Sequence, residues 1–404
     1  MIISSIFLTQ KFFTMERKNF KLYNGITVVT SRLNQQTSVS VTVNVGHVNE
    51  PKLGLAALFE QVLLKQSCGI QAVYGGTITT YFTGCDTQDL ELTLRKLANL
   101  MRMPYFNPEL IKMTADDIVA HTRDLAPLPK RQMKLLYKHT AFRDARKVWD
   151  SDVYIDAING YGMNDLYEFA AKYLTGKNMV VAINCPDYTD EELRNMAEKY
   201  FGEIPAGRKH KVINDIYTGG FDRIASKGSY RQVMMGWDVS NLSNVAEANV
   251  LMSMLSGRLE RSFIGKDVDV EVKIAGYYGM RTLRVAVTSH DGEDINEFID
   301  IICANVNRLR TSLASDRRME TSRNRAMAEK LFIFSQPQDR AVEIAWQVLG
   351  RGQMYDINER INATWQVNAS DVKEIAETIF SKPLTCVVYA DDGVYSYKEI
   401  KAKL

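Results

Sequence analysis

The chain has 404 residues, more than one hydrophobic core usually supports, so at least two domains are expected. Apolar residues make up 46% and charged residues 24%, which is average for soluble globular proteins and excludes a disordered or membrane-embedded chain. Fifty basic and 48 acidic residues leave a formal charge of +2, so we expect no nucleic-acid partner and no binding to an acidic membrane surface. No membrane span is expected either.

The N-terminal stretch is apolar but short. Residues 1–8 are too few to span a bilayer, and no basic region precedes them and no small-residue cleavage site follows, as a signal peptide requires. Met15 stands directly before the charged start at Glu16, so residues 1–15 are predicted to be a flexible extension, of which residues 1–14 lie upstream if Met15 is the true start. With no transit-peptide pattern either, a cytoplasmic location is favoured.

The first half of the chain alternates strand-like and helix-like segments. β-branched residues recur in the strand-like segments, and apolar residues in the helix-like ones follow helical spacing. Strands are predicted at 26–29, 38–45, 77–82 and 179–183, and helices at 53–66, 90–103, 108–121 and 164–174.

The second half repeats this order. Strands are predicted at 230–237, 270–277, 280–288 and 385–389, and helices at 245–263, 295–309 and 370–380. In both halves the last helix opens at a good N-cap residue, near Asn164 and Ser370, and leads into an apolar strand. The repeat predicts an α+β fold of two homologous lobes, each a mainly antiparallel sheet covered by helices.

The pattern is interrupted between the two halves. Pro205, Gly207 and the glycine pair at 219–220 flank a short basic run, which we interpret as a solvated linker rather than a binding patch. The predicted organisation is an extension at 1–15, an N-terminal lobe at 16–204, a linker at 205–222 and a C-terminal lobe at 223–404.

One segment resembles a known family. Residues 54–61 read GLAALFEQ, where the insulinase and mitochondrial processing peptidase family of pitrilysin-like zinc metallopeptidases reads G-L-A-H-x-x-E-H. The stretches at 22–29, 75–76 and 173–181 also resemble that family. The resemblance implies a clamshell half of two lobes.

In that family, two histidines four residues apart bind zinc, and the glutamate before the second activates the metal-bound water. Ala57 and Gln61 stand at the two histidine positions, while Glu60 remains at the general-base position as a vestige. Thr122 occupies the third ligand position, where the family has a glutamate. The resemblance therefore implies no zinc and no other cofactor here, with zinc expected in a partner. Outside this role, Glu60 would lie on the helix surface or make a local hydrogen bond.

The family also uses an arginine and tyrosine pair of the second lobe to contact the substrate carbonyl. Arg258 and Arg261 lie in the matching region, but residues 266–273 contain no tyrosine. The glycine-rich loop of the known non-catalytic processing peptidase subunit is not visible either. The chain thus matches neither the standard active member nor the best-known inactive one.

The resemblance implies a non-catalytic subunit that pairs with an active homologue, or with itself, and binds extended peptides at an exposed sheet edge. One alternative is a structural or assembly subunit of a larger complex, as in the respiratory-complex core subunits that resemble these peptidases. Another is a zinc metalloendopeptidase with an unorthodox metal site using His121, His47 or a partner's ligands. On its own, the chain is expected to be inactive.

Overall fold

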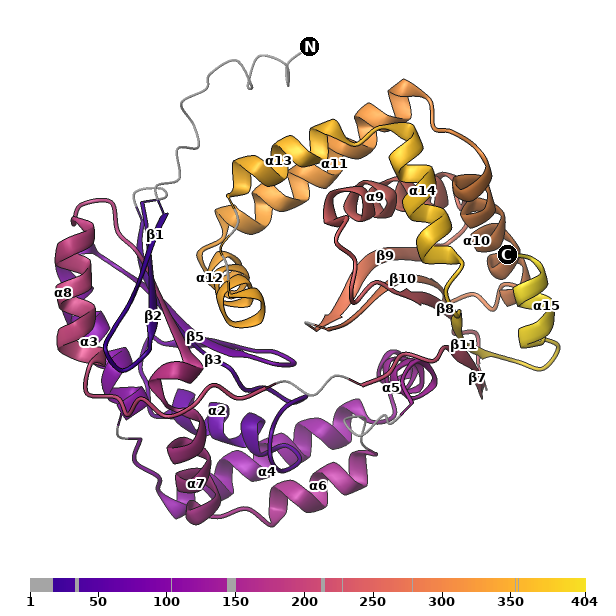
Figure 1. The fold of residues 1–404 in the computed structure, drawn as a ribbon. Helices are drawn as coiled ribbons and strands as arrows, with labels where there is room; N and C mark the ends of the chain where they lie inside the picture. The colour runs from indigo at the N-terminus through magenta and orange to yellow at the C-terminus, as the bar shows by residue number, and fades with distance from the viewer. Residues whose placement is uncertain are drawn as a thin grey trace. The chain divides into compact units, whose positions relative to one another are not determined.

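The computed structural model describes residues 17–32, 36–102, 104–143, 150–211, 215–226, 228–277, 279–352, 354 and 356–404, which form helices around two β-sheets (Figure 1). The predicted extension at residues 1–15 lies outside the described residues. Among the helices of the described residues, none combines the length and the apolar character that crossing a membrane requires.

The first sheet has six strands in the order β1-β2-β6-β3-β5-β4, with β2 and β6 parallel and the other neighbours antiparallel. Its strands are β1 (Arg17–Lys21), β2 (Thr27–Ser31), β3 (Thr37–Val43), β4 (Gln71–Tyr74), β5 (Thr79–Cys85) and β6 (Met179–Asn184). The helices beside it are α2 (Leu55–Lys65), α3 (Leu90–Arg102), α7 (Met163–Tyr173) and α8 (Asp190–Phe201). Helix α3 packs on β3 and β5, and α8 packs on β2.

The second sheet has five strands in the order β7-β11-β8-β10-β9, with β7 and β11 parallel and the other neighbours antiparallel. Its strands are β7 (Gly220–Ala225), β8 (Arg231–Asp238), β9 (Val268–Tyr277), β10 (Met280–Ser289) and β11 (Thr385–Ala390). The helices around it include α9 (Val245–Ser262), α10 (Ile295–Thr311), α14 (Ala369–Phe380) and α15 (Tyr397–Ala402). Strand for strand, this order and these directions repeat β2-β6-β3-β5-β4, which confirms the predicted α+β fold of two homologous lobes.

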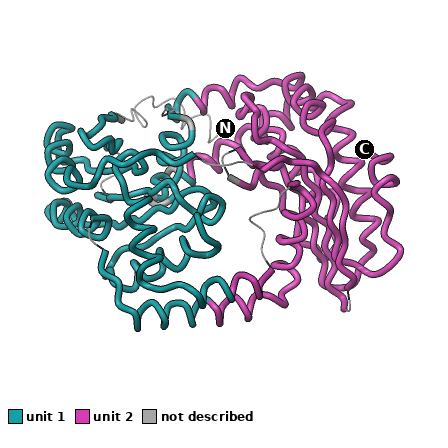
Figure 2. Tube along the Cα trace, turned by 60° about the horizontal axis from the view of Figure 1, so that its bottom comes forward, with its two compact units in different colours: residues 1–118, 156–212, 333–359 teal, residues 119–155, 213–332, 360–404 magenta. Residues whose placement is uncertain are grey.

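The chain divides into two compact units that are interleaved along the sequence (Figure 2). The first unit comprises residues 1–118, 156–212 and 333–359, and the second comprises 119–155, 213–332 and 360–404. The units differ from the predicted lobes because segments 119–155 and 333–359 each join the unit built mainly by the other half. Four helices cross the unit boundaries: α4 (Pro108–Leu125), α6 (Ser151–Asn159), α11 (Asp316–Ser335) and α13 (Ile357–Gln366).

Each exchanged segment places a helix on the sheet face opposite the helix layer. In the second unit, α5 (Pro129–Ala141) packs Met133, Tyr137 and Ala141 against Met234, Ala286 and Val387 of β8, β10 and β11. In the first unit, α12 (Pro337–Ala345) and the π-helical turn Trp346–Arg351 pack on strands β3, β5 and β6. Both sheets are therefore covered on both faces, at least in part.

The helices that lead into β6 and β11 begin one residue earlier than predicted. Helix α7 starts at Met163 after Gly162, and α14 starts at Ala369 after Asn368. The Asn368 side chain accepts hydrogen bonds from the main-chain nitrogens two and three residues on, and the main-chain nitrogen of Asn368 donates one to the Asp371 carboxylate. The capping box thus uses Asn368 rather than Ser370.

Candidate functional site

Helix α2 carries the residues of the degenerate motif. It begins after Gly54, whose φ of 74° is left-handed backbone that glycine adopts without strain. The Glu50 carboxylate accepts hydrogen bonds from the main-chain nitrogens of Gly54 (2.8 Å) and Ala56 (2.9 Å). A carboxylate here satisfies N–H groups at the positive end of the helix dipole, so Glu50 fixes where α2 starts.

The apolar side of α2 holds the helix firmly. Leu58, Phe59, Val62 and Leu63 are buried, and the Phe59 ring lies 4.6 Å from Phe169 of α7, centre to centre. Because these buried residues form two pairs one turn apart along the helix, the side chains between them have fixed directions.

Glu60 belongs to this buried side of the helix. Only 3% of its surface is exposed, and its Oε2 accepts a hydrogen bond of 2.8 Å from Nε2 of Gln61. Burial raises the pKa of Glu60 to about 7, and the hydrogen bond from Gln61 opposes that rise. The neighbouring Tyr81 is also buried, and its pKa is raised well above its usual value by burial and then by the Glu60 charge. The expectation that Glu60 lies on the helix surface was wrong, whereas the local hydrogen bond is present.

The two motif positions beside Glu60 do not fit zinc. Ala57 is partly exposed and has no donor atom, and the exposed Gln61 turns its amide toward Glu60. One carboxylate is too few for a tetrahedral zinc site. Within the described ranges, no cluster of three or more His, Cys, Asp or Glu side chains is arranged to hold a metal ion.

The remaining candidate ligands lie on other elements. Thr122 is buried and His121 is exposed on α4, in the part of that helix assigned to the second unit. His47 precedes α2 and is partly buried, with its ring 5.8 Å from that of Tyr74. At the end of α2, Lys65 forms an ion pair with Asp117 of α4.

The arginine region of the second unit lies on α9. Arg258 is buried, and its pKa is lowered by burial and by the charges of three neighbouring arginines. Glu260 accepts two hydrogen bonds from Arg325, of 2.7 and 3.0 Å. This partly exposed ion pair joins α9 to α11 and engages the Glu260 carboxylate.

Sequence reasoning missed two features of the first unit. One is the cap formed by Glu50, for which the signal is an acidic residue four positions before the glycine that opens the helix. The other is a polar cavity on the sheet face opposite α2, whose lining comes mainly from strands β2 to β6 and α12. No short motif marks that cavity.

Comparison with known proteins identifies the fold. Residues 162–326 match the family described as the peptidase M16 inactive domain. A protease from Helicobacter pylori superposes with a TM-score of 0.82 at 14% identity, covering 93% of this chain and 99% of that one. A chain of complex III2 from Candida albicans, solved with Inz-5 bound, superposes with a TM-score of 0.82 at 15% identity. The match covers 96% of this chain and 99% of that one. A search of curated proteins gives no match. At such identities the two structures establish the fold alone.

Proposed function

We propose that this member of the insulinase and processing peptidase family is a non-catalytic subunit that pairs with an active homologue and helps to bind extended peptides. The observation that carries the proposal is the state of α2: its capping and packing are intact, but Ala57 and Gln61 supply no zinc ligand. A chain that has this fold but lacks the zinc ligands can still bind a peptide or a partner subunit. Zinc and the reacting water would belong to the partner.

The peptide surface we propose is the edge strand β4. It ends the first sheet, so one side of its backbone faces away from β5, and Gln71 and Val73 are exposed. Sheet edges are normally protected from strand addition by charged side chains or proline, and residues 71–74 contain neither. An extended peptide adding a strand there would gain main-chain hydrogen bonds whatever its sequence.

A second candidate function is a structural or assembly subunit of a larger complex. It is favoured by the similarity to a chain of complex III2, which extends over 96% of this chain. In that function the edge of β4 would bind another subunit rather than a free peptide.

Co-purification from the native cells distinguishes these functions. We expect the tagged chain to bring down one homologue with an intact H-x-x-E-H motif, in equal amount, and the pair to cleave peptides. A large assembly without peptidase activity would instead favour the structural function. A second copy of the chain, or zinc bound to the chain alone, would contradict pairing with an active homologue.

Two proline substitutions test the peptide surface. Neighbouring residues of an antiparallel strand point their N–H groups in opposite directions. Ala72→Pro therefore removes a donor that points outward from the sheet, and Val73→Pro removes one that points inward to β5. We expect Ala72→Pro to weaken binding of fluorescein-labelled random decapeptides about tenfold at an unchanged Tm, and Val73→Pro to lower the Tm. Fluorescence anisotropy measures the binding. Equal affinity in both variants and the parent would rule out β4 as the peptide edge.

A further inference from the structure

The sheet face opposite the helix layer in the first unit is polar at one end. Strand pairing places Ser31 of β2, Asn184 of β6 and Ser38 of β3 side by side on this face, and Ser40 follows on β3. The other face of the same strands is aliphatic and faces the helices; it includes Val28, Val39, Val41, Val181 and Ile183. Serine is a poor strand former, and its burial under a helix is costly without polar partners.

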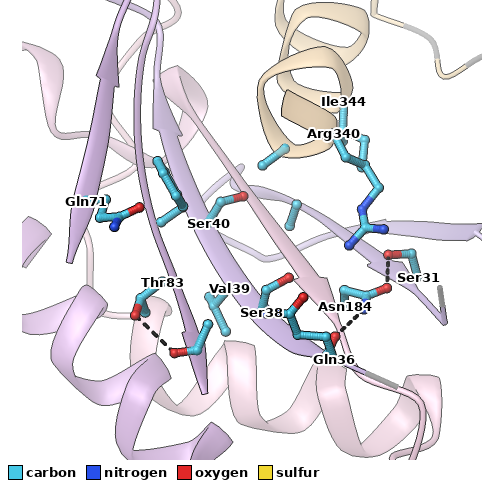
Figure 3. Close-up of a pocket in the computed structure, with 14 residues that line it drawn as sticks. Ser31, Gln36, Ser38, Val39, Ser40, Gln71, Thr83, Asn184, Arg340 and Ile344 are labelled. Carbon is cyan, nitrogen blue, oxygen red and sulfur yellow. Dashed lines mark hydrogen bonds between the residues drawn. The ribbon is translucent and has the colours of Figure 1, made fainter. Parts of the chain in front are cut away.

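Helix α12 covers this face in two different ways. At one end Ile344 and Ala345, with Leu349 beyond them, pack on Val29 and Val180. At the other end, the Arg340 side chain is only 3% exposed and extends from α12 toward Ser31 and Asn184 (Figure 3). Burial lowers the pKa of Arg340, because a guanidinium charge loses hydration in such a place.

A cavity of about 210 Å³ lies between α12 and the sheet. Arg340 is the charged residue among those that line it, and the others are polar or apolar. Hydroxyl and amide groups come from Ser38, Ser40 and Gln71, and apolar surface comes from Phe82, Ala182 and Ile344. The lining thus combines one cation, several hydrogen-bond donors and a small apolar wall.

Hydrogen bonds fix the polar end of the cavity. The Ser31 hydroxyl donates to Asn184 Oδ1 over 2.9 Å, and Asn184 Nδ2 donates to the main-chain oxygen of Gln36 over 2.6 Å. Asn184 is therefore held at both ends of its amide. Its orientation is set before any ligand arrives, which lowers the entropic cost of binding.

We propose that this cavity binds a small monocarboxylate, with Arg340 holding the carboxylate and the apolar wall holding its short carbon chain. A planar guanidinium matches a carboxylate through two parallel hydrogen bonds, and the strength of such a pair rises when water is excluded. The cavity is smaller than usual drug-sized pockets, so the ligand is a short acid or the last residue of a peptide. The site needs no partner subunit, and it shares only Gln71 with the proposed peptide edge of β4.

Calorimetric titration of the purified full chain tests the site with matched ligands. Sodium butyrate is compared with neutral butyramide, and N-acetylvaline with its amide. We expect the acids to bind with a Kd on the order of 1 mM and the amides at least about tenfold more weakly. Butyrate binding alone identifies a free acid, and N-acetylvaline binding alone identifies a peptide terminus. Acids and amides binding equally, or none binding, overturns the proposal.

Variants assign the binding to this cavity. Arg340→Gln is expected to weaken butyrate binding about 10- to 100-fold, and Arg340→Lys less, since lysine keeps the charge but lacks the planar pair of donors. Ser40→Val keeps a good strand residue while filling the cavity, so it tests the site even if Arg340→Gln fails to fold. Arg95→Gln, at an exposed position of α3, is the control and leaves binding unchanged. Unchanged affinity in Ser40→Val or in folded Arg340→Gln would place the ligand elsewhere.

Discussion

Replacing Ala57 and Gln61 together by histidine is expected to give a chain that binds zinc, whereas the parent retains none after dialysis. Residues four apart on a helix lie one turn above each other, so the two imidazoles would share one face of α2. Ala57 is partly exposed and Gln61 exposed, so both positions have room. We expect zinc affinity to rise on the order of 100-fold or more, measured by elemental analysis and competition with a chelator.

Activity should not return with the metal. The third ligand position holds Thr122, and the missing tyrosine after Arg261 leaves the developing oxyanion with less support, a defect worth about 10²-fold in comparable sites. The single variants Ala57→His and Gln61→His are the controls, because one imidazole adds little. If the double variant bound no more zinc than the parent, the match between α2 and the family motif would be wrong.

The buried Glu60 carboxyl should make the stability of the chain depend on pH. Its folded pKa of about 7 lies above the ordinary value of 4.5, so protonated Glu60 favours the folded state. The stability it contributes is complete below about pH 4.5 and is lost as the pH rises through 7. Over that window the raised pKa of Glu60 lowers the free energy of unfolding by about 3 kcal/mol.

Glu60→Gln removes this dependence while keeping the shape of the side chain. We expect the free energy of unfolding of the variant, relative to that of the parent, to rise by about 2 to 3 kcal/mol from pH 5 to pH 8. Urea unfolding at both pH values measures it. Glu374→Gln, at an exposed position in the middle of α14, is the matched control and should show no such gain. Parallel pH profiles for parent and Glu60→Gln would show that Glu60 is solvated.

Most of the fold was predictable because its elements carry local signals. The β-branched alternation predicted β3, and the strand pair β9 and β10 was predicted from the same pattern. Helix α5 was not predicted. Its apolar residues Met133, Tyr137 and Ala141 are spaced by four, which is a visible stripe, but the strands they cover lie far along the chain.

The site was predictable in position but not in environment. The motif placed Ala57, Glu60 and Gln61 on one helix, as the structure shows. It did not reveal that Glu60 is buried, because the neighbours that exclude water, such as Tyr81, come from other elements. The cavity was missed for the same reason: Ser38 and Ser40 alternate with valines as in a solvent-facing strand, and only α12 encloses them.

The interleaving of the two units has a consequence for synthesis. Strand β3 and helix α12 belong to one unit but are about 300 residues apart in the chain. At about 5 to 20 residues per second, the ribosome needs roughly 15 to 60 seconds between them. Once Val180 has been made, about 160 residues still separate it from α12, and over that part of the interval Val29 and Val180 form an apolar face that α12 does not yet cover. The first unit to be started is therefore not finished until nearly the whole chain has been made.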